Sequence, residues 1–495
     1  MSAQGCLLGL DIGTTGSKAL AFSPQGQVVA RGYQDYPLLV DAAGAAELDA
    51  AQVLAAVRVA VAQAASQARE AGAGPVLALA TAAQGEAITP VDASWRPLGP
   101  SVLTFDRRGE TGRALLAAAG WERHTEQTGL PLSWIVTAAK LAALRNADAE
   151  RYAAAHAFLC YEDLVVAHLT GRPVISDSLA QRTWLLDRRR RNWDAAAQQE
   201  LGLVGRLAEV ASSGTRVGEV SLVGAEAFGL PAGTVVVAGA HDQTAALVGT
   251  GGLDPGQAAH STGTVDCMSL CLPDGPAAAY CRHGYGLGLH PLAGRAVTLA
   301  FGFGGGSLLA WWRTVLGGEP DIGALLAEAR LEPDGPLAVP FWAGSGTPDL
   351  DAADRGALFG LTLDSGRADI TGALLRGMAL EAARNLEVLG SLGLRVSRVA
   401  LVGGGSRDPR WSQLRADVTG CVYQEMPVRD AGCLGAAMMA GVGAGLFGSL
   451  EEAARGMVGS GRAFSPDPER HAAFAAARRA YREAVPATRR VRLTQ

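Results

Sequence analysis

The sequence lacks the signatures of several large classes of protein. Its seven cysteines are odd in number, scattered, and include no CxxC pair. Such a set favours reduced thiols, so we expect a cytoplasmic protein. No basic segment precedes the first apolar run, which predicts that there is no signal peptide. The formal net charge of −5 leaves no electrostatic footprint for nucleic acid.

Motifs of common nucleotide-binding and metal enzymes are missing as well. There is no GxxxxGK[ST] loop, which excludes a P-loop enzyme, and there is neither an HExxH motif nor a Cys/His cluster with zinc spacing. One uncharged window, 431–450, has membrane-spanning length. It is mostly Ala and Gly, so we expect a buried helix, with Gly441 and Gly445 allowing close helix contact, and no membrane partner.

The stretch that stands out is 8–20, LGLDIGTTGSKAL. Apolar runs flank a Gly/Thr turn, which predicts two strands joined by a hairpin. Gly13 lets the backbone approach a ligand, and the hydroxyls of Thr14 and Thr15 join the turn N–H groups as donors suited to phosphate. The alternative is a plain β-hairpin.

Two charged residues accompany this hairpin. Asp11 ends the first strand, where a buried carboxylate is costly unless it is paired or near a metal. Magnesium prefers one or two carboxylates combined with substrate phosphates, which makes Asp11 the metal candidate. Lys18 can add a positive charge beside the phosphates.

A second copy of this pattern follows at 257–272, where Gly263 and Thr264 form the turn. Two such hairpins suggest two similar lobes, each offering one phosphate-gripping turn. The chain of 495 residues is too long for one core. The Gly/Pro-rich segment 249–256 suggests domains at 1–249 and 250–495.

Asp242 is the carboxylate best placed for catalysis. It follows an apolar strand predicted at 234–240 and lies beside the proposed hinge. A carboxylate in a domain cleft can accept a proton from a substrate hydroxyl. The alternative is a structural role, in which Asp242 caps the helix that follows.

Further candidates lie on predicted loops that follow strands, where α/β domains bind ligands. They are Gln84, Glu86 and Asp106, for which the alternative is ordinary surface polarity. A glycine triplet at 403–405 follows a strand and precedes a helix, which suits a nucleotide or a tight packing turn. The basic run 187–194 is predicted to be a solvated loop.

Helical periodicity is predicted at 47–70, 134–145, 307–315, 369–389, 409–420 and 469–484, between short apolar strands. Five motifs in order then resemble the FGGY family of carbohydrate kinases, within the superfamily of actin and the heat-shock chaperones. They are DIGTTGSK (11–18), AGAHDQTAALVG (238–249), STGT (261–264), the segment 356–386 and GGGSRDPRWSQLRADVTG (403–420).

The resemblance implies an α/β fold with two ribonuclease-H-like (actin-like ATPase) lobes, and a cleft that binds ATP and Mg²⁺. It further implies that Asp242 is the catalytic base and that the sugar site also includes Gln84, Glu86, Asp106 and Gln243. The phosphate grip would include Gly13, Thr14, Thr15, Lys18, Gly263 and Thr264, and the adenosine would face Gly404, Asp408 and Gly306.

Some positions depart from the family pattern. The motif at 84–86 reads QGE, where glycerol kinases show Arg-Glu and xylulose kinases Met-His. Thr104 and Ile135 replace aromatic residues of glycerol kinases, and Arg376 replaces an acidic residue of the C-terminal signature. These departures argue against glycerol and leave a xylulose-like ketopentose first.

Ribulose, fuculose, erythritol and gluconate follow as substrates, and the chain could form a homodimer. A nucleotide-dependent chaperone or regulator, hydrolysing ATP without a sugar, is the rival from another class. That rival predicts a peptide-binding extension, whereas only helices are predicted after Gly420.

Overall fold

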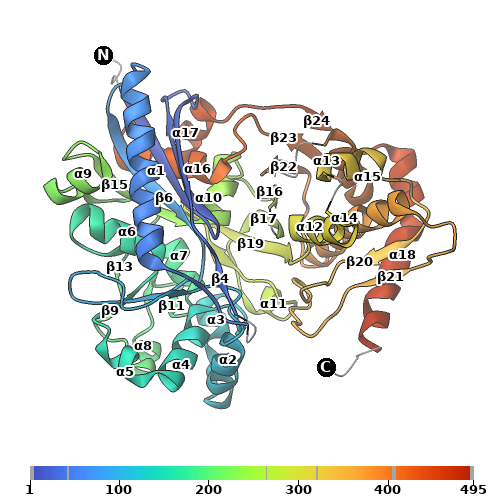
Figure 1. Cartoon of the computed structure of the whole chain (residues 1–495), viewed down its shortest axis with the longest axis horizontal. Helices are drawn as coiled ribbons and strands as arrows, with labels where there is room; N and C mark the ends of the chain where they lie inside the picture. The colour runs from blue at the N-terminus through green and yellow to red at the C-terminus, as the bar shows by residue number, and fades with distance from the viewer. Residues whose placement is uncertain (1–4, 42–43, 264, 319–320, 404–407, 491–495) are drawn as a thin grey trace.

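The computed structural model describes residues 5–41, 44–263, 265–318, 321–403 and 408–490. Two large sheets dominate it, one on each side of the molecule (Figure 1). The first has the strand order β14-β15-β6-β1-β2-β3. Its strands are β1 (Cys6–Ile12), β2 (Gly16–Phe22), β3 (Val28–Asp35), β6 (Val76–Ala83), β14 (Arg216–Glu219) and β15 (Val235–His241).

The second sheet has the order β18-β19-β17-β16-β22-β23-β24. Its strands are β16 (Gln257–Thr262), β17 (Asp266–Pro273), β18 (Gly288–Leu289), β19 (Arg295–Gly302), β22 (Arg398–Val402), β23 (Val422–Glu425) and β24 (Ala463–Phe464). Shorter strands in smaller sheets are β4 (Leu39–Val40), β5 (Ala46–Leu48), β7 (Thr89–Val91), β8 (Ser101–Val102), β9 (Ala157–Leu159), β10 (Val174–Ser176), β11 (Leu186–Asp187), β12 (Asn192–Trp193), β13 (Glu209–Ala211), β20 (Leu337–Val339) and β21 (Ala357–Phe359).

The central strands of the two sheets share one topology. In the first, β1, β2 and β3 form an antiparallel meander, and β6 and β15 then add in parallel beside β1. In the second, β16, β17 and β19 form the meander, and β22 and β23 add in parallel beside β16. The two predicted Gly/Thr hairpins are therefore equivalent corners of two repeated units, as the sequence repeat indicated.

Helices cover both sheets. Helix α1 (Ala50–Glu70) begins after its N-cap Asp49 and packs a stripe of Val and Ala side chains under β2 and β3. The predicted long helices at 369–389, 409–420 and 469–484 correspond to α14 (Arg367–Ser391), α15 (Pro409–Thr419) and α18 (Pro468–Arg490).

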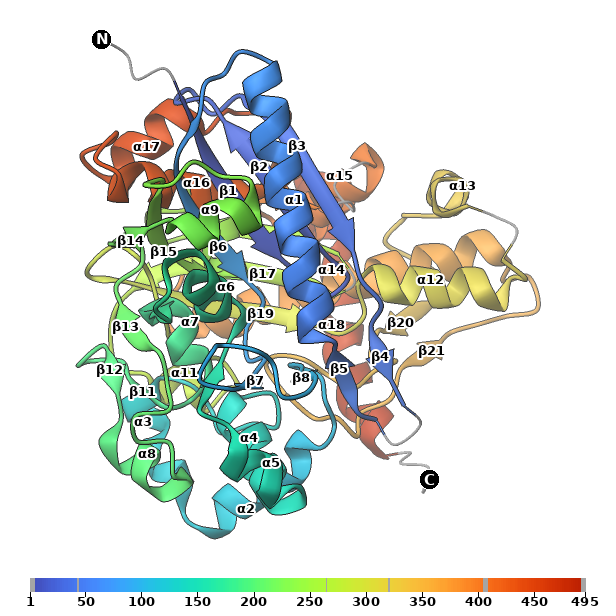
Figure 2. The ribbon, with the colours of Figure 1, turned by 60° about the vertical axis from the view of Figure 1, so that its left-hand side comes forward.

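The remaining helical segments connect the strands or form the lower part of the first lobe (Figure 2). They are α2 (Gly109–Ala118), η1 (Trp121–His124), α3 (Thr125–Thr128), α4 (Thr137–Ala147), α5 (Ala149–Ala154), α6 (Tyr161–Thr170), α7 (Asp177–Arg182), α8 (Ala195–Leu201), α9 (Leu222–Phe228), α10 (Asp242–Gly249), α11 (Ala278–Cys281), α12 (Gly306–Val315), α13 (Ile322–Glu328), α16 (Ala431–Gly443) and α17 (Leu450–Met457).

The lobes meet through α10 and α16, which follow equivalent strands, β15 and β23. A Cβ on Gly435 would lie 1.9 Å from the carbonyl oxygen of Ala245, and one on Gly249 would lie 2.0 Å from that of Ala431. The close contact therefore uses these glycines, and the expected role of Gly441 and Gly445 is wrong. Gly441 faces Phe447 within the lobe instead, while a Cβ on Gly445 would meet nothing within 4 Å.

Helix α16 also packs on β1, β6 and β15 of the first sheet, so the C-terminal half of the chain returns to the N-terminal lobe. The division at 249–250 stays a prediction. The window 431–450 contains the buried helix expected there, and no helix among the described residues is long and apolar enough to cross a bilayer.

The basic run 187–194 differs from the expectation of a solvated loop. It forms the hairpin of β11 and β12, and Arg188 within it is buried. The Arg188 guanidinium pairs with Asp274 and donates to the carbonyl oxygen of Gly275 at 3.2 Å. Arg188 thus connects a segment before the proposed domain boundary with a segment after it. Charge patterning in the sequence does not reveal such a long-range contact.

Candidate active site

Two hydrogen bonds to the Gly13 carbonyl oxygen hold the first hairpin, which is the β1–β2 turn. The Tyr36 hydroxyl donates to the Gly13 oxygen at 2.6 Å, and Gln84 Nε2 donates to the same oxygen at 3.0 Å. The Gly13 N–H closes the turn onto Gly16 O at 3.1 Å. Thr14 is half-buried and Thr15 is exposed, so both stay accessible to a ligand.

The second hairpin is closed by a different neighbour. The N–H of Gly306, the first residue of α12, donates to the Gly263 oxygen at 2.7 Å. The structure therefore brings the predicted residues Gly263 and Gly306 together. Thr264 and Gly404 lie outside the described residues, and Asp408 is the N-cap of α15, accepting from Arg410 N at 2.8 Å.

Asp11, Lys18 and Asp430 form a charged group where α16 meets the first hairpin. Lys18 Nζ lies 3.1 Å from Asp430 Oδ1, and Arg31 pairs with the other oxygen at 3.2 Å. Burial raises the pKa of Asp11 to about 6, while Lys18 opposes that shift. Asp430 was missed by sequence reasoning, because nothing local connects it to a strand 412 residues earlier.

These groups fit a magnesium ion only with help from a ligand. Among the residues that the structure describes, no cluster of three or more His, Cys, Asp and Glu side chains could hold a metal by itself. Asp11 is a half-buried carboxylate whose charge is poorly compensated, which suits a cation that also takes phosphate oxygens. The predicted role of Asp11 stays a prediction.

Asp242 is the first residue of α10 and follows directly on β15. Burial, and then the charge of Asp11, raises the pKa of Asp242 to about 7. The two carboxylates are therefore close enough for their charges to interact. Asp242 Oδ1 accepts the N–H of Gln243 at 2.6 Å, and Nε2 of His241 lies 3.1 Å away. Burial lowers the pKa of His241 to about 3, so its ring is neutral.

Glu86 is held at both ends. Its side chain is buried, pairs with the Arg182 guanidinium, and accepts Nε of Arg182 at 2.6 Å and the Thr104 hydroxyl at 3.1 Å. Thr137 and Lys140 each donate to its backbone oxygen at 3.0 Å. These contacts fix a residue in the left-handed region, with φ of 60°.

Its surroundings also set the charge state of Glu86. Burial alone would raise the pKa of Glu86, but the charge of Arg182, with that of Lys140, holds it below its ordinary value. Glu86 is therefore an ionised carboxylate at neutral pH. Arg182 and Lys140 were not among the predicted site residues, and no local motif marks either of them.

Position 85 has no room for a side chain while His241 stays in place. A Cβ on Gly85 would lie 2.7 Å from His241 Nε2, closer than real Cβ atoms come. The imidazole thus occupies the space that a larger residue at position 85 would need. Next to it, Gln84 Oε1 is buried and has no hydrogen-bond partner among the described residues, which suits a ligand donor.

Asp106 makes none of the hydrogen bonds that hold Glu86, and has partners of its own. Its side chain is fully buried and accepts the N–H of Ala46 at 2.9 Å and Nε of Arg108 at 2.9 Å. These contacts give Asp106 a structural function in its loop, and a sugar-binding role stays a prediction. Gln243 does face the second lobe, because its Oε1 accepts the Ser269 hydroxyl at 3.4 Å.

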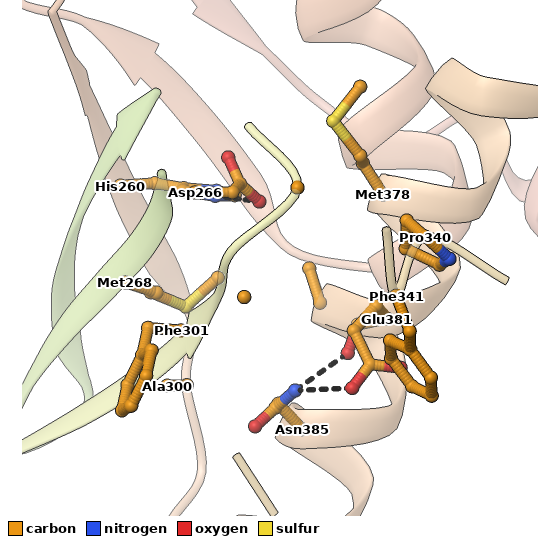
Figure 3. A pocket seen from close by; sticks show the side chains of 13 residues that line it. His260, Asp266, Met268, Ala300, Phe301, Pro340, Phe341, Met378, Glu381 and Asn385 are labelled. Carbon is orange, nitrogen blue, oxygen red and sulfur yellow. Dashed lines mark hydrogen bonds and ion pairs between the residues drawn. The ribbon is translucent and has the colours of Figure 1, made fainter. Parts of the chain in front are cut away.

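A small cavity, of about 30 Å³, lies behind the second hairpin (Figure 3). His260, Asp266 and Met268 line one side, and Met378 and Glu381 of α14 line the other. Asn385 closes the cavity by donating to the Glu381 backbone oxygen at 3.0 Å. Its polar side chains are thus engaged with one another.

Comparison with known proteins agrees with this geometry. Residues 6–249 match the model of the FGGY family of carbohydrate kinases, N-terminal domain, and residues 300–444 match that of the C-terminal domain. The chain is 32% identical to a glycerol kinase of Bordetella parapertussis, with 91% of each chain covered. It is 28% identical to a xylulose kinase of Escherichia coli, covering 96% of this chain and 97% of the other.

Solved structures agree as well. A xyloylose kinase from Brucella ovis superposes with a TM-score of 0.89 at 26% identity, over 98% of this chain and all of the other. A xylulose kinase from Lactobacillus acidophilus, at 20% identity, shares the fold with a TM-score of 0.90 over 99% of both chains. The two repeated sheets are thus the two ribonuclease-H-like lobes, and this chain belongs to the FGGY family of carbohydrate kinases.

Proposed function

We propose that this protein transfers the γ-phosphate of ATP to a hydroxyl of a ketopentose or a related sugar or polyol, in the cytoplasm. The observation that carries the proposal is Asp242, a half-buried carboxylate of raised pKa beside Asp11, near hairpins contributed by equivalent corners of both sheets. A glycerol kinase of Plasmodium falciparum that shares the fold was solved with ADP. All seven cysteines are free, which supports a reducing compartment.

Proton transfer to Asp242 begins the reaction. As the substrate oxygen forms its bond to the γ-phosphorus, the bond from that phosphorus to the β–γ bridging oxygen breaks, and ADP leaves. Asp242 accepts the hydroxyl proton through Oδ2, because Oδ1 is occupied by Gln243 N. His241 is neutral and therefore does not compete for this proton.

The two turns supply most of the remaining catalysis as positioning and electrostatic stabilisation. The N–H groups and hydroxyls of Thr14 and Thr15 are the proposed donors for phosphate oxygens, because the N–H groups of Gly13 and Gly306 already close the turns. Mg²⁺, when bound, neutralises the phosphate charge, and Asp11 would hold it. Asp430 holds Lys18 next to Asp11, because Lys18 Nζ lies 3.1 Å from the carboxylate of Asp430.

Among substrates, a xylulose-like ketopentose comes first and glycerol second. The identity of 32% to a glycerol kinase favours glycerol. Against it, the space at Gly85 is filled by the His241 ring, and Thr104 donates its hydroxyl to Gly85 O at 2.6 Å. The QGE segment therefore differs in shape from the Arg-Glu segment expected of glycerol kinases. Ribulose, fuculose, erythritol and gluconate remain candidate substrates to be assayed.

A coupled ADP-release assay over ketoses, polyols and sugar acids tests the proposal. We expect ADP release that depends on one alcohol and stays near background without it. Release that is equally fast with every compound and with none would contradict a kinase and favour the sugar-independent ATPase. A homodimer stays a prediction, which sedimentation of the purified chain would check.

A further inference from the structure

A second, small cavity, of about 30 Å³, lies between the two lobes beside Arg182. One wall is the segment 130–136 before α4, and the facing wall is formed by β19 together with 284–288. On β19, Val297, Leu299 and Phe301 alternate along the strand and share one face. The cavity is therefore built by both halves of the chain.

This cavity adjoins the proposed sugar site through Arg182. Arg182 lines it and pairs with Glu86, which belongs to that site. Leu299 lies directly opposite Ser269 on β17, and the Ser269 hydroxyl contacts Gln243. A ligand whose hydroxyl reaches Asp242 would thus direct its other end toward this cavity.

The walls of the cavity are apolar. Leu130, Ile135, Val136 and Val297 are buried there, and Leu299 and Phe301 are half-buried. The glycines at 284, 286 and 288 add no side chain. Polar side chains are limited to Ser133 and Arg182, and Nε of Arg182 already donates to Glu86 at 2.6 Å.

This lining discriminates between substrates by the terminal group that they place in the cavity. A terminal hydroxymethyl group buried here would lose water without gaining enough partners, which is unfavourable. A methyl or other alkyl group would gain burial, and one such carbon changes specificity roughly 10–200-fold in an apolar pocket. The net charge offered is small, because the Arg182 cation is balanced by Glu86.

We propose that this interlobe cavity is a subsite for an apolar end of the substrate, so that, among ketopentoses and related sugars and polyols, a neutral deoxy or alkyl-substituted member is preferred over its fully hydroxylated counterpart. This proposal rests on the kinase function proposed above. It adds Leu299 and Ile135 as specificity-determining residues on opposite walls.

The test uses pairs of alcohols that differ in one terminal group, such as a ketopentose and its 1-deoxy and 5-deoxy analogues. Wild-type kcat/KM should be roughly 10–200-fold higher for the better methyl-bearing member of a pair. Leu299→Thr should lower this preference about tenfold, and Ile135→Thr should do so from the other wall. Val223→Thr, on the exposed surface of α9, is the matched control.

KM for ATP should stay unchanged in both wall variants, with thermal unfolding confirming that each folds. If the hydroxylated members are used as well as the deoxy ones, or if both wall variants keep the wild-type preference, the subsite is overturned while the kinase stands. If no alcohol of either kind releases ADP, the kinase function fails and the subsite falls with it.

Discussion

The two Gly/Thr hairpins occupy equivalent corners of the two sheets, yet their surroundings differ in charge. Beside the β1–β2 turn, Asp11 and Asp242 have pKa values raised to about 6 and about 7 by burial. At the β16–β17 turn, Asp266 is within 3.0 Å of His260 and 3.7 Å of Arg415. There burial is outweighed, and the pKa of Asp266 is held below its ordinary value.

The two equivalent turns therefore have different electrostatic surroundings and, we infer, different functions. In the first lobe the carboxylates lack sufficient partners within the protein, which leaves them available to a proton and a cation. In the second lobe the charge of Asp266 is compensated by His260 and Arg415, and Arg415 also donates to the Thr262 hydroxyl at 2.5 Å. We infer that the first lobe carries the chemistry, and that the second provides a rigid grip.

The largest effect should come from Asp242→Asn. The amide cannot accept the hydroxyl proton, so kcat should fall about 10²–10⁴-fold. Steady-state kinetics with the best alcohol of the panel would measure this, with ATP binding followed separately. Asp266→Asn in the second lobe is the matched control and should lower stability more than kcat per folded molecule. Equal losses of kcat in the two variants would remove the distinction between the lobes.

Arg415→Met should give the next largest effect, on stability. The guanidinium is 1% exposed on its side chain and neutralises Asp266. Removing one partner of a buried ionic group costs about 3–5 kcal/mol, because the remaining charge is left uncompensated. Urea unfolding would measure the loss. Arg455→Met, on the exposed surface of α17, should change stability little.

The hairpins could be predicted from sequence because their signal is local. A turn of Gly and Thr between apolar runs, as at 8–20, is visible within about a dozen residues. Long periodic helices such as α14 were placed to within two residues at each end for the same reason. The order of five motifs then suggested the lobes, which the sheets and the family match confirm.

The pairings that complete the site could not be predicted. Arg182 and Glu86 are 96 residues apart, and Lys18 and Asp430 are 412 apart. Such contacts depend on how β15, α7 and α16 are brought together by the fold, and a single sequence contains no local trace of them. The exclusion of a side chain at Gly85 by His241 is of the same kind.

A smaller, graded effect is expected from pH. Since the pKa of Asp242 is raised to about 7, the carboxylate is protonated below that pH and cannot accept a proton. In the simplest case kcat/KM should fall about tenfold for each pH unit below 7. Asp266, whose pKa is lowered, should not contribute to this fall in kcat/KM. A flat pH profile between 5 and 8 would contradict the assignment of Asp242 as the base.

The contribution of Asp242 to stability should run the opposite way. The folded protein binds this proton more tightly than the unfolded chain, whose carboxyl has a pKa near 3.8. The group therefore favours folding fully below about pH 4, and its contribution is lost as the pH rises through about 7. Comparing thermal unfolding of the wild type and of Asp242→Asn across this pH range would measure the contribution of Asp242 to stability.

The smallest effect should come from Tyr36→Phe, which tests how the first turn is held. Its hydroxyl donates to Gly13 O at 2.6 Å and lies 3.2 Å from the Ser17 hydroxyl. A neutral hydrogen bond contributes about 0.5–1.5 kcal/mol, so KM for ATP should rise roughly 2–10-fold with kcat less affected. Tyr33→Phe, on the preceding strand β3 and 50% exposed, is the control. If Tyr36→Phe behaves like Tyr33→Phe, Gln84 alone holds the Gly13 carbonyl. The first turn would then depend on an amide of the proposed sugar site, and sugar binding would be coupled directly to the phosphate grip.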